Sequence, residues 1–145
     1  MTDKIIKRYT YNVNANDFMA AGKGSSAIKS NLKSLGIDAN IIRRIAIISY
    51  ESEINIVIHS YGGKIHCDIY EDKIVIISED TGPGIKDVDM AMTEGFSTAT
   101  DNIRELGFGA GMGLPNIKKY SDRLEIKTGK QEYNQGTTII VTVYL

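Results

Sequence analysis

The sequence is poor in residues that cross-link or stiffen a chain, with one cysteine, two prolines and no tryptophan among 145 residues. The single cysteine, Cys67, excludes an internal disulfide and a zinc site built from several cysteines, and it is typical of a reducing cytoplasm. The chain also lacks a long uncharged apolar run, and its start, MTDKIIKRYT, has no apolar core of a signal peptide. The sequence therefore predicts a cytoplasmic protein without a membrane partner.

An excess of charge of one sign is lacking as well. The chain has 17 Lys and Arg against 18 Asp and Glu, a formal net charge of −1. This balance gives no general attraction for nucleic-acid phosphates, and the short basic pairs Arg43-Arg44 and Lys118-Lys119 are interpreted as solvated helix positions. With 42% hydrophobic and 24% charged residues, the chain is expected to fold as one domain, residues 1–145, with no nucleic-acid partner.

The periodicity of the apolar residues predicts five strands and three helices. Ser25 and Ser26 are expected to cap the first helix and Gly36 to end it, while Gly62 and Gly63 end the second. Together these elements predict an α+β two-layer sandwich with its helices on one side of the sheet. The expected strands are residues 5–13, 64–70, 73–78, 123–128 and 137–144, and the expected helices are residues 25–35, 39–60 and 114–121, with a short helical turn around 88–93 inside a mobile loop.

Glu51 and Asn55 form the first pattern that could carry chemistry. They lie four positions apart on the predicted long helix, so both side chains leave the same face. An amide oxygen can ligate magnesium, and a nearby carboxylate can accept a proton from an incoming hydroxyl, which are two requirements of phosphoryl transfer. Alone, the pair is also consistent with an ordinary solvated helix face.

The second pattern is Asp80-Thr-Gly82-Pro-Gly84, directly after an apolar strand. Glycines at these positions would let the backbone approach a flat ring, and Asp80 could accept a hydrogen bond from an exocyclic amine, as in adenine. An ordinary Pro-Gly turn at the end of a strand would have the same sequence.

Glycines at positions 107, 109, 111 and 113 form the third pattern, directly before the predicted helix 114–121. Free backbone amides and a helix N-terminus suit phosphate oxygens. A Rossmann fingerprint does not fit, because the third glycine is missing and the loop does not open a first βαβ unit. The segment Gly22-Lys23-Gly24-Ser25 is not a Walker loop either, because Asp17 stands where the upstream glycine is required.

The order of the three patterns resembles the GHKL, or Bergerat, ATPases: E-x-x-x-N on a helix, then D-x-G-x-G after a strand, then G-x-G-x-G-x-G before a helix. Within that superfamily the GFST segment, the GLPNIKK helix and the chain length are most similar to the anti-sigma-factor serine/threonine kinases and the related switch kinases. The resemblance covers nearly the whole chain. It implies a two-layer α/β sandwich of the Bergerat type, with a mixed sheet and helices on one face.

The resemblance also implies a role for each matching residue. Glu51 would be the catalytic base and Asn55 the magnesium ligand, while Asp80 would contact the adenine amino group in a pocket shaped by Gly82 and Gly84. The phosphate-facing loop would comprise Gly107, Gly109, Gly111 and Gly113, Thr137 or Thr138 would complete the adenine end, and residues 86–106 would form the lid over ATP.

The function implied by the resemblance is a serine/threonine kinase that uses ATP and Mg²⁺ to phosphorylate a STAS-type anti-sigma antagonist during partner switching. A sigma factor or a PP2C-type phosphatase would be a further partner, and a homodimer is expected. The alternative is a non-catalytic module in which ATP orders the lid and thereby controls docking. Glu51 distinguishes the two, because only a catalyst needs a base. A stand-alone ATPase would need a second domain to harness hydrolysis, and the sequence predicts none.

Overall fold

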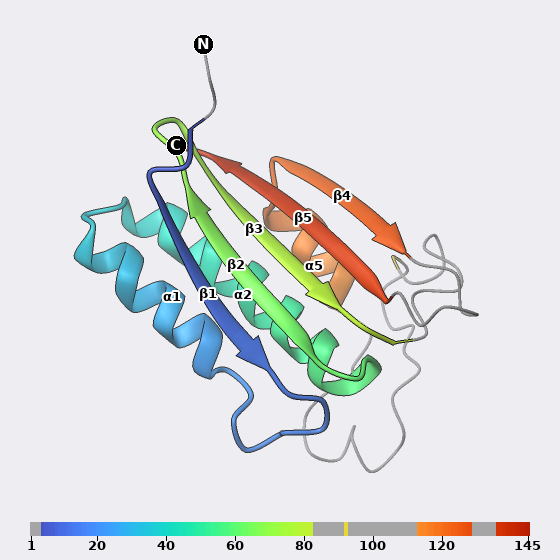
Figure 1. Ribbon diagram of the computed structural model, residues 1–145. Coiled ribbons are helices and arrows are strands. Elements are labelled where there is room, and N and C mark those ends of the chain that lie inside the picture. The colour runs from blue at the N-terminus through green and yellow to red at the C-terminus, as the bar shows by residue number, and fades with distance from the viewer. Residues whose placement is uncertain (1–3, 83–91, 93–112, 129–135) are drawn as a thin grey trace.

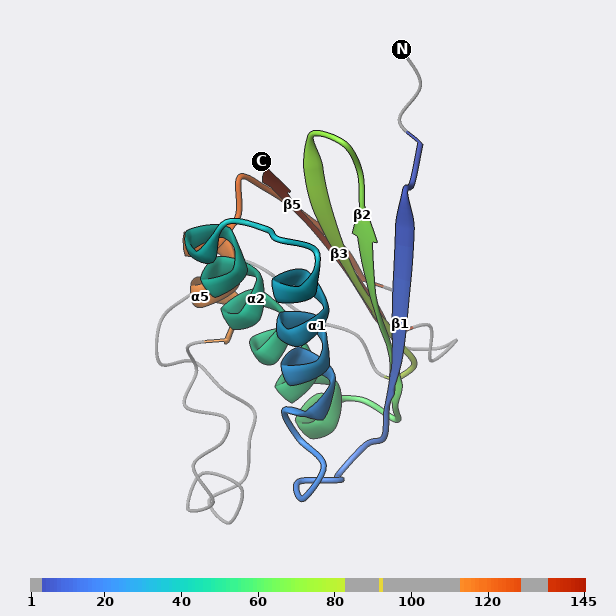
Figure 2. The same cartoon turned by 90° about the vertical axis from the view of Figure 1, so that its left-hand side faces the viewer.

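The computed structural model describes residues 4–82, 92, 113–128 and 136–145. Within these ranges, one five-stranded sheet in the order β1-β2-β3-β5-β4 is covered on one face by three helices (Figures 1 and 2). The α+β sandwich predicted from the sequence is therefore confirmed. The strands are β1 (Lys7–Val13), β2 (Gly63–Ile69), β3 (Lys73–Asp80), β4 (Arg123–Thr128) and β5 (Thr137–Tyr144), and the helices are α1 (Lys23–Ser34), α2 (Ala39–His59) and α5 (Gly113–Tyr120).

Every pair of neighbouring described strands is antiparallel. The mixed sheet implied by the resemblance is therefore wrong for these strands. The order of the elements explains the difference: β2 and β3 form a tight hairpin closed by the hydrogen bond from Tyr70 N–H to Lys73 O at 2.9 Å, and β5 returns antiparallel between β3 and β4.

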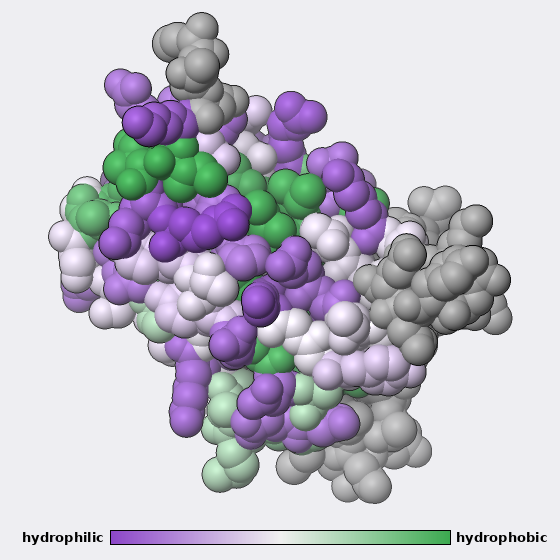
Figure 3. All heavy atoms as spheres, in the orientation of Figure 1, coloured by the Kyte–Doolittle hydropathy of each residue, from purple (hydrophilic) through white to green (hydrophobic). Residues whose placement is uncertain are grey.

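The core lies between the sheet and the helices and consists mainly of isoleucine and valine. Strand residues point alternately to the two faces of a sheet, and in β5 each second residue from Thr137 to Val143 is buried against the helices. The opposite face of the sheet carries hydrophilic and weakly polar side chains, with hydrophobic atoms in separate groups (Figure 3). The largest fully buried side chains are Ile28, Leu32, Ile45, Ile48, Ile56, Ile65, Ile74, Ile76 and Ile117.

Cys67 lies on β2 within this core and is fully buried. Burial, with a smaller contribution from the neighbouring Asp68 carboxylate, raises the pKa of the Cys67 thiol to about 12. The thiol is therefore held in its neutral form. None of the described helices is long and apolar enough to cross a membrane.

Helix α2 is the central helix of its layer and packs between α1 and α5 (Figure 2). Its N-cap is Asp38, whose side chain accepts a hydrogen bond from the Asn40 N–H at 3.0 Å. It ends at His59, and Gly62 follows with φ +114°, as the predicted glycine stop requires. Arg44 joins α2 to the end of α5 and to the residues that follow it. Its guanidinium donates a hydrogen bond to Tyr120 O at 2.9 Å and forms an ion pair with Asp122 at 3.1 Å.

The start of α1 differs from the prediction. Gly22, with φ +97°, is the N-cap, and neither Ser25 nor Ser26 caps the helix with its side chain. Instead, the buried Glu53 carboxylate of α2 accepts the N–H groups of Gly22, Gly24 and Ser25 at 3.0, 3.2 and 3.0 Å. A carboxylate at a helix N-terminus satisfies amides that have no partner within the helix, so Glu53 joins α1 to α2.

We expect Glu53→Ala to lower the free energy of unfolding by about 2–4 kcal/mol, because three amides, two of them buried, lose their acceptor together. Urea denaturation measures this change. Glu71→Ala, in the exposed turn between β2 and β3, is the control and should shift stability by less than about 0.5 kcal/mol. Equal stability of the two variants would contradict a structural role of Glu53.

Candidate nucleotide-binding site

Glu51 and Asn55 lie one turn apart on α2, where the start of α5 approaches the helix. A Cβ atom placed on Gly113, the first residue of α5, would lie 3.0 Å from Asn55 Oδ1 and 3.4 Å from Glu51 Oε2. Glycine therefore lets the α5 backbone come close to both side chains. The last glycine of the predicted phosphate loop and the predicted E-x-x-x-N pair meet at one point.

The Glu51 carboxyl is half-buried, and burial raises its pKa. A hydrogen bond from Asn116 Nδ2 to Glu51 Oε1, at 3.4 Å, acts in the opposite direction. A carboxylate with a raised pKa is a better proton acceptor near neutral pH than an exposed one. Asn116 was not predicted as a site residue, although its place three residues after Gly113 on an expected helix could have indicated it.

Asp80 ends β3 at the opposite side of the site. Its Oδ1 accepts the Thr137 N–H at 3.0 Å, and burial raises the pKa of its carboxyl to about 6 despite this bond. Gly136, with φ +70°, packs against Asp80, and a Cβ there would lie 2.1 Å from Asp80 O and 2.5 Å from Oδ1. Gly136 was also missed, and only its place in the Gly/Asn turn before the last strand could have indicated it.

Gly82 is buried and has φ +145°, a backbone conformation that L side chains rarely adopt, and a Cβ there would make a tight contact of 3.2 Å with Ser60 Cα. Its carbonyl accepts the Gly136 N–H at 3.0 Å. Of the two candidate threonines, Thr137 is buried and lies beside Asp80, whereas Thr138 lies on the other face of β5. The structure therefore brings Thr137, and not Thr138, to the Asp80 side chain.

The other predicted site residues cannot be placed in the same way. Residues 86–106, the predicted lid, lie outside the described residues apart from Met92, and so does the short helical turn expected around 88–93. The predicted site glycines that lie outside the described ranges are Gly84, Gly107, Gly109 and Gly111.

The site residues described above form two clusters near the C-terminal half of α2. Glu51, Asn55 and Gly113 form one of them, and Gly82, which lies against Ser60, belongs to the other. Asn55 lies four residues before the end of α2 and Ser60 directly follows the helix, so the C-terminal end of α2 lies next to both clusters.

The amide oxygen of Asn55 suits magnesium. Mg²⁺ prefers oxygen ligands and takes one or two from the protein while phosphates and water supply the rest. Among the described residues no group of three or more His, Cys, Asp or Glu side chains could hold a metal. One amide oxygen beside a helix N-terminus therefore fits a magnesium ion that would be bound together with phosphates, and the neighbouring Glu51 carboxylate remains available to accept a proton.

A sheet covered on one face by three helices, with both clusters placed along the central helix, is the arrangement of a Bergerat-type ATPase domain. The family model for histidine kinase-, DNA gyrase B- and HSP90-like ATPases matches residues 39–145. The chain belongs to this ATPase family, and that membership implies ATP binding. The match begins at α2, so it includes every residue of the two clusters.

Three relatives place the chain more narrowly. It is 36% identical over 97 residues to the anti-sigma F factor of Clostridium novyi (strain NT), which covers 63% of this chain and 62% of that protein. It is 33% identical over 100 residues to the anti-sigma F factor of Caldanaerobacter subterraneus subsp. tengcongensis, covering 66% and 64%. The third is the serine/threonine-protein kinase RsbT of Bacillus subtilis (strain 168), 32% identical over 100 residues, covering 66% and 69%. The chain thus spans a little under two thirds of the two anti-sigma F factors.

Proposed function

We propose that this chain is an ATP-binding anti-sigma regulatory protein that transfers the γ-phosphoryl group of MgATP to a serine or threonine of a STAS-type anti-sigma antagonist. The observation that supports the proposal is that the Glu51 and Asn55 side chains lie together against Gly113, the first residue of α5. The names of the relatives, two anti-sigma F factors and a serine/threonine-protein kinase, support it.

In this proposal Asn55 Oδ1 is a magnesium ligand, and the metal would neutralise charge on the phosphates. The Glu51 carboxylate accepts the proton of the attacking serine or threonine hydroxyl. The hydroxyl oxygen bonds to the γ-phosphorus, and the bond from that phosphorus to the β,γ-bridging oxygen breaks to release ADP. Asp80 accepts a hydrogen bond from the adenine amino group, in a pocket formed with Gly82 and Thr137. The glycines at 107, 109 and 111 and the lid at 86–106 complete the phosphate side.

The proposal also includes further protein partners, a sigma factor or a PP2C-type phosphatase. In the proposal the chain itself is a cytoplasmic homodimer.

Isothermal titration with a non-hydrolysable ATP analogue, with and without Mg²⁺, tests the nucleotide site first. Binding that depends on magnesium is expected, and absence of binding at millimolar analogue would contradict the proposal. Transfer from labelled ATP to purified STAS-domain proteins of the same organism tests the kinase step. Nucleotide-dependent binding of those proteins without transfer would favour the non-catalytic module instead.

The pH dependence of nucleotide affinity tests the role of Asp80. Its carboxyl is charged above a pKa of about 6 and neutral below it, and a protonated carboxyl is a weaker acceptor for the adenine amine. We therefore expect affinity to fall as the pH drops through about 6. Asp80→Asn removes this titration, whereas titration of the nucleotide phosphates is common to both proteins. Identical pH profiles for the two proteins, measured by calorimetry, would exclude Asp80 from adenine recognition.

A further inference from the structure

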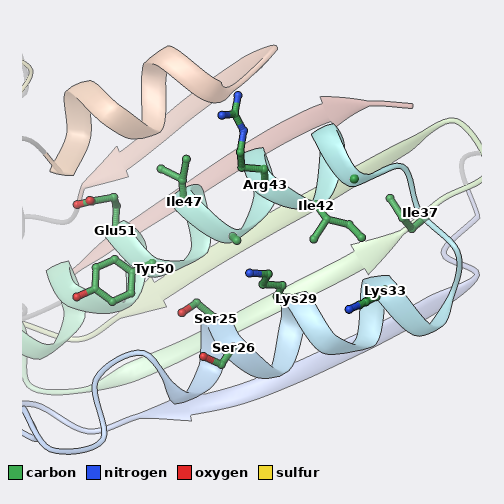
Figure 4. Close-up of a pocket in the computed structure, with 12 residues that line it drawn as sticks. Ser25, Ser26, Lys29, Lys33, Ile37, Ile42, Arg43, Ile47, Tyr50 and Glu51 are labelled. Carbon is green, nitrogen blue, oxygen red and sulfur yellow. The ribbon is translucent and has the colours of Figure 1, made fainter.

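A groove of about 780 Å³ runs between α1 and α2 on the outer surface of the helix layer. Its floor is apolar and includes Ile37 and Ile42, and the two helices form its walls, with Ile47 on the side of α2 that points away from α1 (Figure 4). The ATPase family match begins at residue 39, so the α1 wall lies before the segment that is common to the family. The proposed kinase chemistry does not require this groove.

The walls of the groove are positively charged. Lys29 and Lys33 from α1 and Arg43 from α2 line it and are exposed, whereas Glu51 is the one acidic side chain among its lining residues. The lining thus carries three positive charges against one negative, although the whole chain has a net charge of −1. Among the described residues none of the three basic side chains forms an ion pair, in contrast to the neighbouring Arg44, which pairs with Asp122.

One end of the groove coincides with the nucleotide site. Tyr50 and Glu51 lie at that end, and Ile37 lies at the other (Figure 4). The same Glu51 carboxylate that reaches the groove also lies against Gly113. From Ala39 to Glu51 the α2 wall spans twelve helical steps, about 18 Å or a little over three turns. A segment lying along the groove would therefore end at the proposed base.

We propose that the groove docks an acidic amphipathic helix of the protein substrate and thereby brings the acceptor hydroxyl to Glu51. An apolar floor between helices accepts the apolar stripe of such a helix, and the basic walls select acidic residues on its flanks. This inference rests on the proposed kinase function and adds to it the docking surface and the chemistry of the segment recognised there.

Single charge reversals test the proposal in the full chain. Lys29→Glu, Lys33→Glu and Arg43→Glu are each expected to raise the KM for a purified STAS-domain substrate of the same organism about fivefold, the scale of one exposed charge pair. Little change is expected in kcat or in the affinity for the ATP analogue, because the nucleotide clusters are untouched. Lys29→Arg keeps the charge and should keep the KM. Lys7→Glu, on the edge strand β1, is the matched control and should change neither quantity.

Two results would overturn the proposal, and they are distinguishable. If the three groove variants have the same KM as Lys7→Glu while the unaltered chain phosphorylates the substrate, the docking surface is wrong and the kinase function stands. If the unaltered chain phosphorylates none of the STAS-domain proteins, the proposed function fails and the docking proposal fails with it. Circular dichroism melting curves verify that each variant is folded.

Discussion

Glu51→Ala is expected to lower phosphoryl transfer to a protein substrate by about 100-fold or more while leaving ATP affinity almost unchanged. The Glu51 carboxylate lies beside Asn55 and the start of α5, and burial raises its pKa, both of which favour proton transfer from a hydroxyl held at that point. Single-turnover transfer from labelled ATP measures the chemical step, and calorimetry measures nucleotide affinity separately.

Glu51→Gln refines this experiment, because glutamine keeps an oxygen that can accept the Asn116 hydrogen bond but cannot take up a proton at neutral pH. We expect the same loss of transfer as in the alanine variant. Glu125→Gln, at an exposed position of β4, is the control and should transfer normally. Normal transfer by either Glu51 variant would show that another group acts as the base.

Asn55→Ala is expected to remove the magnesium-dependent part of nucleotide binding. In the presence of Mg²⁺ the affinity for the nucleotide should fall at least about tenfold, which corresponds to about 1.4 kcal/mol. The amide oxygen lies against Gly113 at the end of the predicted phosphate loop, where Asn55 would help to hold a metal ion bound with the nucleotide. Titrations with and without Mg²⁺ measure this part directly. Without magnesium, the variant and the unaltered chain should bind with similar affinity.

Asn40→Ala is the matched control for this variant, since Asn40 lies on the first turn of the same helix and is exposed. It should retain the full magnesium effect. Undiminished magnesium dependence in Asn55→Ala would remove Asn55 from the proposed ligands, and a large drop in melting temperature would show that its effect is on folding.

Much of the fold could be predicted because its signals are local. The alternation in residues 137–144 and the short turn between β2 and β3 each reflect the geometry of a few neighbouring residues, and both elements are present as predicted. The pairing of Glu51 with Asn55 follows in the same way from the helical period. Gly113 could be connected to that pair only through the order of the three patterns along the chain.

The features that were missed depend on contacts between distant parts of the chain. In the sequence, Glu53 is 28 to 31 residues from the amides whose hydrogen bonds it accepts. Asn116 is 65 residues from Glu51, to which it donates a hydrogen bond. Gly136 is required because Asp80 leaves no room for a Cβ. Periodicity shows which face of an element is buried but not which distant group meets it, so serine caps were predicted for α1 where a carboxylate from another helix serves.

The buried Cys67 makes the chain convenient for site-specific labelling. Thiolates, not thiols, attack maleimide, and a fully buried thiol with a pKa of about 12 supplies very little thiolate to a reagent. A fluorophore can therefore be attached at an introduced surface cysteine, for example through Lys7→Cys, without first replacing the native residue. Any slow reaction of Cys67 itself would then report how often β2 is uncovered by opening of the domain.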